Sequence, residues 1–205
     1  MTNLLAVVTG YLIGSISFAV LSSWLFGLPD PRTYGSGNPG ATNVLRTGKA
    51  AAAALTLVGD AAKGATAVLI ARAGAAQLGL TETTIAAVAV AAFLGHLYPV
   101  FFGFKGGKGV ATAFGLLVAL SGWVALLAGS VFLAVVLVSR YVSLASVTAA
   151  LAAGFAAPVI LGWTPTAVAI VLMGALVIAR HQANIRRLLY GGESRVRLGS
   201  RRPPG

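Results

Sequence analysis

Apolar residues fill long runs of the chain, and short polar segments separate these runs. A helix that crosses a lipid bilayer needs about 20 mostly apolar residues. The first run contains no charged residue and is longer than the ~7–15-residue apolar core of a signal peptide. Five runs therefore predict membrane-spanning helices: Leu4–Leu28, Ala50–Ala71, Thr83–Phe104, Tyr141–Leu161 and Thr166–Ala179.

A sixth apolar run, residues 110–139, fits neither one span nor two full spans. At about 1.5 Å per residue, a single helix of this length would exceed the ~30 Å hydrocarbon layer. The centre of the run reads Ser121-Gly122-Trp123, which suits a turn beside an interfacial aromatic residue. The apolar pattern alone leaves open a single helix or a hairpin.

Composition supports a membrane protein, because 58% of the residues are hydrophobic, 9% are charged, and the mean hydropathy is +0.90. Soluble domains average about 25% charged residues. The chain has no cysteine, which excludes disulfides, thiolate metal sites and cysteine nucleophiles. The net charge of +11 does not indicate nucleic acid as a partner, because the basic residues gather between the spans. There they set topology and attract anionic lipids or phosphate.

The basic residues decide between the single helix and the hairpin. A hairpin gives seven spans, and with the N-terminus outside it leaves only Lys63 and Arg72, of 15 basic residues, off the inner face. A single helix would put Lys108 and Arg140 on opposite faces, against the positive-inside rule. We therefore predict an all-α integral membrane protein, a bundle of seven transmembrane helices with a cytoplasmic C-terminus. Residues 1–194 form one domain, and the basic tail, residues 195–205, is predicted to be disordered.

The first inner segment reads YGSGNPGATNVLR, residues 34–46. Its glycines permit tight turns that expose backbone N–H groups, its small polar side chains offer neutral hydrogen bonds, and its arginine offers a fork for phosphate. A plain turn loop is the alternative, but the density of polar groups favours a binding site. The candidate ligands are Ser36, Gly37, Asn38, Asn43 and Arg46.

The segment GFKGGKGVAT, residues 103–112, resembles a nucleotide-binding loop only in part. The pattern G-x-x-x-x-G-K-[ST] requires glycine where Phe102 stands and a hydroxyl where Gly109 stands, so we expect no nucleotide. Glycine N–H groups, two ammonium groups and the start of a helix remain, and together they favour an anion pocket. Lysines that only set topology would need no glycines. The candidate ligands are Lys105, Gly106, Gly107 and Lys108.

Two further inner segments carry candidate chemistry. In RYVSLAS, residues 140–146, Ser143 and Ser146 share one helical face. In RHQANIRRLLYGGE, residues 180–193, His181 and Asn184 also lie three residues apart. His181 suits a proton shuttle or a phosphate ligand. The residues alone equally allow an interfacial histidine above a basic amphipathic helix.

Ionisable residues also occur inside the apolar runs. Asp60 and Lys63 are three residues apart in the second run, so they can pair and lower the cost of burial. A structural ion pair and a functional pair both remain open. A lone histidine, His96, is interpreted as a structural hydrogen-bonding group.

The inner segments together hold many hydrogen-bond donors and only two acids, Asp30 and Glu193. This balance suits a multiply charged anion, and it suits neither a magnesium nucleotide nor a catalytic metal. We expect no metal and no cofactor. The acyltransferase motif His-x₄-Asp and the G-x-S-x-G elbow are both absent. The residues alone therefore predict a phosphate-handling membrane protein, which could be an enzyme, a transporter of phosphate or glycerol phosphate, or a lipid-binding protein.

These motifs resemble those of the bacterial membrane glycerol-3-phosphate acyltransferases that use acyl phosphate as donor. The resemblance covers most of the chain. It rests on GSGNPGATNVLR (35–46), Asp60 with Lys63-Gly64, GHLYPVFFGFKGGKGVAT (95–112), RYVSLAS (140–146), HQANIRRLL (181–189) and Gly192-Glu193. One departure is GGES, which stands where the family has Gly-x-Glu; Glu193 keeps the acid and is expected to support the site.

The resemblance implies a seven-helix enzyme of the bacterial plasma membrane with its active site on the cytoplasmic face. Its substrates would be acyl phosphate and glycerol 3-phosphate, its surroundings membrane lipid, and its functional partner the soluble enzyme that makes acyl phosphate. By position, Ser36, Arg46, Lys105, Ser143, His181 and Asn184 would line the active site. We expect Arg46, Lys105 and Ser143 to hold phosphate. The glycerol hydroxyls and the acyl carbonyl would be positioned by Ser36, His181 and Asn184.

Overall fold

The computed structural model of the chain describes residues 1–196, and within that range it contains helices and no strands. The last part of the predicted tail, residues 197–205, lies outside the described residues. The helices are α1 (Thr2–Gly14), α2 (Phe18–Leu25), α3 (Ala41–Leu45), α4 (Ala50–Ala73), α5 (Ala75–Leu78), α6 (Glu82–Leu97), the 3₁₀ turn η1 (Val100–Phe102), α7 (Val110–Leu120), α8 (Gly122–Ser139), α9 (Val142–Leu161), α10 (Pro165–Arg180) and α11 (Gln182–Leu189).

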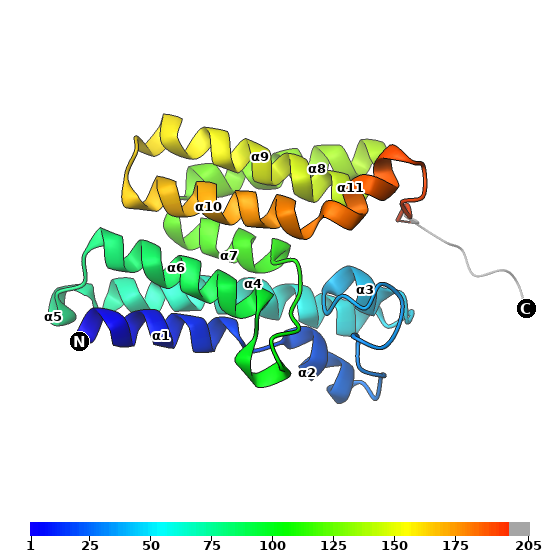
Figure 1. Ribbon diagram of the computed structural model, residues 1–205, viewed down its shortest axis with the longest axis horizontal. Helices are drawn as coiled ribbons and strands as arrows, with labels where there is room; N and C mark the ends of the chain where they lie inside the picture. Colours follow the sequence, from blue (N-terminus) through cyan, green and yellow to red (C-terminus); the bar gives the residue numbers. More distant parts are fainter. Residues whose placement is uncertain (197–205) are drawn as a thin grey trace, which may run out of the picture.

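The long helices form two packed groups with α7 between them (Figure 1). In one group α1, α4 and α6 contact one another, and in the other α9 packs between α8 and α10. Helix α7 contacts members of both groups and buries Leu116 and Leu120 in the shared core. The approach of α7 to α4 requires a glycine, because a Cβ at Gly115 would collide with the backbone carbonyl of Ala61. Small residues at crossings of this kind let membrane helices approach closely.

The run at residues 110–139 divides at Ser121, so the predicted break is confirmed. Helices α7 and α8 run in opposite directions (Figure 1). The predicted count of seven spanning helices is not confirmed. Five segments are long and apolar enough to span a membrane: Thr2–Leu25, Ala50–Ala73, Glu82–Phe102, Gly122–Ser139 and Val142–Leu161. The pair α10–α11, bent by 57°, makes six, whereas the 11 residues of α7 reach only about 16 Å.

The predicted span Leu4–Leu28 corresponds to the segment Thr2–Leu25, but this segment is not one continuous helix, because the chain breaks between α1 and α2 at Ser15–Ser17. At this break the Ile16 carbonyl accepts a hydrogen bond from Lys63 Nζ at 2.5 Å. The Ser15 hydroxyl bonds back to the Tyr11 carbonyl at 2.9 Å. Polar partners in the neighbouring helix and in the preceding turn therefore satisfy backbone groups at the break.

All the polar segments singled out in the sequence gather at one end of the bundle (Figure 1). We call this end, made of residues 26–49, 98–109, 140–141 and 181–196, the basic end. The N-terminus and the connections α5–α6, α7–α8 and α9–α10 lie at the opposite end. The first residues of the predicted tail still contact the bundle, since Val196 N donates to the Arg140 carbonyl at 2.8 Å. That the basic end faces the cytoplasm stays a prediction.

Candidate active site

Asn184, on α11, is the centre of a hydrogen-bonded row at the basic end. Its side chain is 6% exposed. The amide oxygen accepts a hydrogen bond from Lys108 Nζ, and the amide nitrogen donates to Glu193 Oε1 at 2.6 Å. The other carboxylate oxygen of Glu193 accepts from Arg187 Nε at 2.8 Å. The row thereby joins the glycine–lysine loop to α11 and to the segment that follows it, and it fixes which way the Asn184 amide points.

Opposing effects set the charge of the two ionisable groups that contact Asn184. Burial alone would raise the pKa of Glu193, but hydrogen bonds from Asn184 and Arg187 outweigh it and hold the pKa below its ordinary value. Burial lowers the pKa of Lys108, and repulsion from Arg187 adds to this effect, while the Glu193 carboxylate opposes it. The site thus keeps one carboxylate among several cations. Such a balance favours an anionic ligand.

His181 lies at the junction of α10 and α11 and is 3% exposed. Its Nδ1 atom is 2.7 Å from the Val177 carbonyl. Because a carbonyl only accepts hydrogen bonds, Nδ1 carries the proton, and in the neutral ring Nε2 holds the lone pair. The backbone of α10 therefore orients the ring and leaves Nε2 as the acceptor.

Ser143, in the first turn of α9, has a buried hydroxyl without a hydrogen-bond partner among the described residues. The hydroxyl faces the Glu193 carboxylate, but the two groups do not form a well-aligned hydrogen bond. An unpaired buried hydroxyl costs free energy, about 1–3 kcal/mol, unless a ligand or water pairs with it. Ser143 is therefore available to a bound molecule.

The first inner segment is organised by Asn43 of α3. The buried Asn43 amide donates to the carbonyls of Pro31 and Tyr34 at 2.8 and 3.1 Å and accepts from the backbone N–H of Ser36 at 3.0 Å. With both amide hydrogens used, Asn43 shapes the loop, although the sequence suggested it as a ligand. Gly37 closes a turn with a φ of +66° that only glycine adopts readily. Asn38 lies half-buried beside that turn.

Among the candidate ligands of this segment, Ser36 and Arg46 present side chains to the surface. Arg46 Nη2 donates to the Ser194 hydroxyl at 3.2 Å, which brings the arginine beside the Glu193 segment. The structure thus brings Arg46, Lys108, Ser143, His181 and Asn184 to one place, from four separate stretches of chain.

The glycine–lysine loop packs closely against the end of α6. Gly107 N donates to the His96 carbonyl at 3.2 Å, and a Cβ at Gly106 or Gly107 would collide with His96. Arg180 of α10 donates to the carbonyls of Gly106 and Gly107 at 3.2–3.3 Å. In this structure the glycines therefore serve close packing of the loop. Lys105 is exposed, whereas Lys108 is half-buried against Asn184.

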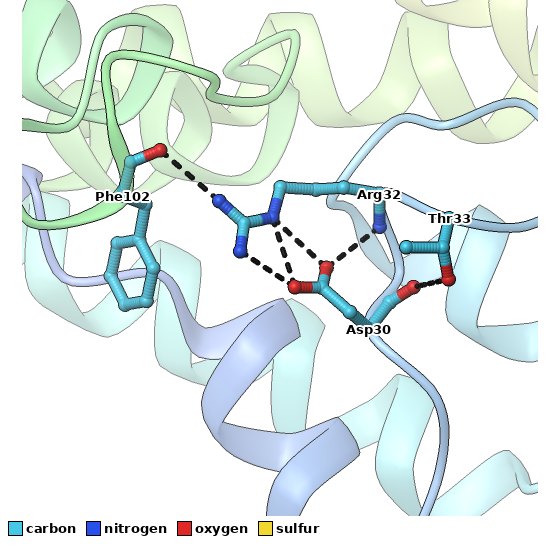
Figure 2. Close-up of polar contacts among 4 residues, drawn as sticks. All are labelled: Asp30, Arg32, Thr33 and Phe102. Atoms are coloured by element: carbon cyan, nitrogen blue, oxygen red, sulfur yellow. Dashed lines mark hydrogen bonds and ion pairs between the residues drawn. The ribbon is translucent and has the colours of Figure 1, made fainter.

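A second clamp holds this loop to the first inner segment (Figure 2). Arg32 makes a forked ion pair with the Asp30 carboxylate, at 2.6 Å between Nη2 and Oδ2, and donates from Nη1 to the Phe102 carbonyl at 3.1 Å. The Arg32 hydrogen bonds hold the pKa of Asp30 below its ordinary value. The clamp fixes the spacing of the two loops that carry Arg46 and Lys105.

The sequence did not single out Arg180, Arg187 or the Asp30–Arg32 pair as parts of the site. Arg180 and Arg187 belong to a basic segment, where any arginine could simply face lipid headgroups. A signal was present in Asp30, because a lone acid in a basic segment needs a partner. Within residues 1–196 no group of three or more His, Asp or Glu residues could hold a metal ion.

Comparisons with known proteins show which family the chain resembles. A family profile described as "Glycerol-3-phosphate acyltransferase" matches residues 4–191. A glycerol-3-phosphate acyltransferase of Thiobacillus denitrificans is 53% identical over 196 residues, covering 96% of this chain and 98% of that protein. One from Neisseria meningitidis serogroup C is 56% identical with the same coverage.

Two crystal structures of PlsY (YgiH), an integral membrane glycerol 3-phosphate acyltransferase, share the fold. The glycerol 3-phosphate form superposes with a TM-score of 0.88 at 43% identity and 96% coverage of both chains. The lysophosphatidic acid form superposes with a TM-score of 0.86 at 42% identity and 95% coverage of both chains.

Proposed function

Because the chain belongs to the glycerol-3-phosphate acyltransferase family, we propose that it transfers a fatty acyl group from acyl phosphate to the 1-hydroxyl of sn-glycerol 3-phosphate. The hydroxyl oxygen forms an ester bond to the acyl carbon, the bond from that carbon to the phosphate oxygen breaks, and the hydroxyl proton passes to a base. The products are 1-acylglycerol 3-phosphate and inorganic phosphate. The reaction is the first acylation of phospholipid synthesis.

The observation that carries the proposal is the gathering of cations and unpaired polar groups around Asn184. Lys108 and Arg187 flank the Asn184–Glu193 pair, and Arg46 reaches the adjacent Ser194. The Ser143 hydroxyl is buried and has no hydrogen-bond partner within residues 1–196. Both proposed substrates are phosphate anions, which charge-assisted hydrogen bonds from arginine and lysine bind well. A site of this kind supports binding two phosphates close to one hydroxyl.

We assign different roles to the two lysines of the glycine–lysine loop. Lys108 is already bonded to the Asn184 oxygen, so it orients that amide. Lys105 is exposed and its ammonium makes no hydrogen bond within the described residues, so this ammonium is the one available for a substrate phosphate. Arg46 contributes the second phosphate contact, and the Ser143 hydroxyl a third. Asn184 and Ser36 position the glycerol hydroxyls and the acyl carbonyl.

Two groups can receive the hydroxyl proton. The first is His181 Nε2, which holds the lone pair because Nδ1 donates to the Val177 carbonyl. The second is the phosphate of the donor itself. Acyl phosphate is an activated mixed anhydride, so orientation and electrostatic stabilisation can suffice without a strong protein base. Turnover of His181→Ala at saturating substrates separates the two: near-normal turnover assigns the proton to phosphate, and a large loss assigns it to His181.

We place the reaction on the cytoplasmic side of a bacterial membrane. The positive-inside rule assigns the basic end to the cytoplasm, where acyl phosphate from a soluble enzyme would arrive. A C-terminal reporter that scored as external would overturn this placement.

The decisive experiment uses the purified protein with acyl phosphate and glycerol 3-phosphate, and measures release of inorganic phosphate. Acyl-CoA and acyl carrier protein serve as parallel donors. Phosphate release that requires both substrates supports the proposal. If the protein accepted an acyl group from acyl-CoA or acyl carrier protein but not from acyl phosphate, the proposal that acyl phosphate is the donor would be overturned.

A matched pair of variants tests the phosphate site. Lys105→Ala should raise the KM for at least one substrate about tenfold, since a charge-assisted hydrogen bond is worth about 1.5–3 kcal/mol. Lys49→Ala removes the same charge from an exposed position at the same end and should leave both KM values near wild type. Equal effects of the two variants would mean that only the general positive potential matters.

The transporter alternative is not favoured. The matched relatives are acyltransferases by name. The outer segments, residues 79–82 and 162–165, also carry few polar groups that could form a second gate.

A further inference from the structure

A buried polar network lies in the core beside the glycine–lysine loop, and the proposed reaction does not use it. Its members are Asp60 and Lys63 of α4, His96 of α6 and Thr112 of α7, with exposures of 3%, 4%, 7% and 0%. Ionisable groups at this depth are expensive, and in membrane proteins they are usually kept for a function. The contacts of the network indicate what that function is.

Lys63 uses its ammonium group to join three helical segments. Nζ lies 2.8 Å from Asp60 Oδ1, 3.0 Å from His96 Nδ1 and 2.5 Å from the Ile16 carbonyl at the α1–α2 break. The contacts with His96 and with the Ile16 carbonyl are hydrogen bonds, whereas the contact with Asp60 is an ion pair without an aligned hydrogen bond. A simple ion pair would need only Asp60. The other two contacts fix α4 against α6 and against the break.

His96 connects Lys63 to the glycine–lysine loop. Since Lys63 can only donate, His96 Nδ1 is the acceptor, and the Thr112 hydroxyl lies 3.1 Å from the same atom. On its other side His96 touches the loop, because its carbonyl accepts from Gly107 N at 3.2 Å and its Nε2 occupies the place of a Gly107 side chain. The next residue, Lys108, bonds to Asn184.

We propose that Asp60, Lys63 and His96 are positioning residues that set the place of the glycine–lysine loop, so that Lys108 reaches Asn184. They touch no substrate and act through Gly107. The effect of the network on catalysis rests on the proposed function. The geometric claim, that the network holds Lys108 on Asn184, rests only on the contacts described above. A network that only stabilised the fold would leave Lys108 in place whenever the variant folded.

The test compares two substitutions of one residue. His96→Asn keeps an amide oxygen close to the position of Nδ1, where it can still accept from Lys63. His96→Leu fills similar space and accepts nothing. Thr112→Val, of nearly the same shape as the natural residue, removes only the hydroxyl contact. It gives a second test should His96→Leu fail to fold.

The readout is the rate of reductive methylation of each lysine, measured by mass spectrometry on the full-length protein in detergent without substrates. Lys108 should be protected in the wild type, and Lys105, exposed in the same loop, is the internal control. We expect His96→Leu to raise the Lys108 rate about tenfold at an unchanged Lys105 rate, and to lower kcat/KM for glycerol 3-phosphate by a similar factor, since small misplacements cost up to about 100-fold. His96→Asn should restore most of both.

The proposal is overturned if Lys108 stays as protected as in the wild type in His96→Leu or Thr112→Val while these variants melt cooperatively. It is also overturned if His96→Asn and His96→Leu expose Lys108 equally. If the wild type transfers no acyl group, the proposed function fails, but the methylation rates still decide whether the network positions Lys108.

Discussion

In the row Lys108–Asn184–Glu193, each hydrogen bond has a defined donor and acceptor. Exchanging the donor and acceptor between Asn184 and Glu193 tests whether the row holds the segment that carries Glu193. In Asn184→Asp, a carboxylate replaces the amide. Its oxygens can still accept from Lys108, but the amide hydrogens that bond Glu193 Oε1 at 2.6 Å are lost. Two carboxylates then face each other at hydrogen-bond distance. We expect the segment that carries Glu193 to leave its position.

The size of the effect follows from the geometry. Two unit charges 4 Å apart interact by about 4 kcal/mol at an effective dielectric of 20. The neighbouring Lys108 and Arg187 cations offset part of this repulsion, and Arg187 is 46% exposed, so water screens it. We therefore expect the substitution to destabilise the segment that carries Glu193 by about 1–2 kcal/mol. This value combines the screened repulsion with the loss of one hydrogen bond.

The assay is hydrogen exchange of backbone amides in residues 190–196, together with the melting temperature in detergent. Asn184→Asp should speed exchange in this segment about tenfold or more, because 1.4 kcal/mol corresponds to a factor of ten. Adding Glu193→Gln should reverse the effect, since the new amide donates to the new carboxylate and the hydrogen bond reforms with its direction exchanged. The single variant Glu193→Gln is the matched control.

The reasoning is refuted if the double variant exchanges as fast as Asn184→Asp alone. That result would mean that repulsion between carboxylates is not the cause. Recovery of exchange protection without recovery of activity would be consistent with the row, and would show that the Asn184 amide itself contacts substrate.

Three further predictions concern the loops and the pH dependence. Asn43→Ala should lower the melting temperature and kcat/KM together, because it removes three hydrogen bonds worth about 1 kcal/mol each; an unchanged melting temperature would contradict the loop-shaping role. Gly107→Ala should abolish activity through collision with the end of α6, whereas Gly122→Ala, which meets open space, should be silent in the same phosphate-release assay. The pKa of Asp30 lies below its ordinary value of 3.8, so its pairing with Arg32 stabilises the loops above that pH and is lost as the pH falls through the lowered pKa. Asp30→Asn should therefore flatten the acid side of a plot of melting temperature against pH, by an amount of about 1 kcal/mol or less because both groups are partly exposed.

The sequence predicted the hairpin of α7 and α8 because the positions of the basic residues decided between one helix and two, which the hydropathy pattern left open. Residues 110–139 contain no charge; Ser121-Gly122-Trp123 suggested where a turn could lie, and the requirement that Lys108 and Arg140 share a face decided for the hairpin. The same logic failed for the first run. No charged residue lies near Ser15–Ser17, and Lys63, which donates a hydrogen bond to the Ile16 carbonyl at the break, lies in another helix. A break that depends on a tertiary partner leaves no local pattern.

Residue type predicted which segments meet at the basic end, but not what each polar group does there. Asn43 has the chemistry of a ligand, yet its amide is used by the carbonyls of Pro31 and Tyr34. Gly106 and Gly107 resemble an anion loop, yet their lack of side chains is required by His96. In each case composition identifies a polar or permissive residue, and only the fold shows whether its capacity is already used within the protein.

The two lysines of the glycine–lysine loop show the same limit most clearly. Side chains three residues apart point the same way in a helix, but residues 105–109 are not helical, so this rule does not apply to the two lysines. The structure directs Lys108 inward to Asn184 and leaves Lys105 exposed. A lysine already bonded to a buried amide is held in place and orients its partner, whereas an exposed lysine at the same site keeps its donors for an incoming anion. The proposed division, in which Lys108 positions Asn184 and Lys105 binds phosphate, therefore rests on the backbone conformation of the loop and on the amide that Lys108 meets, neither of which the residue type encodes.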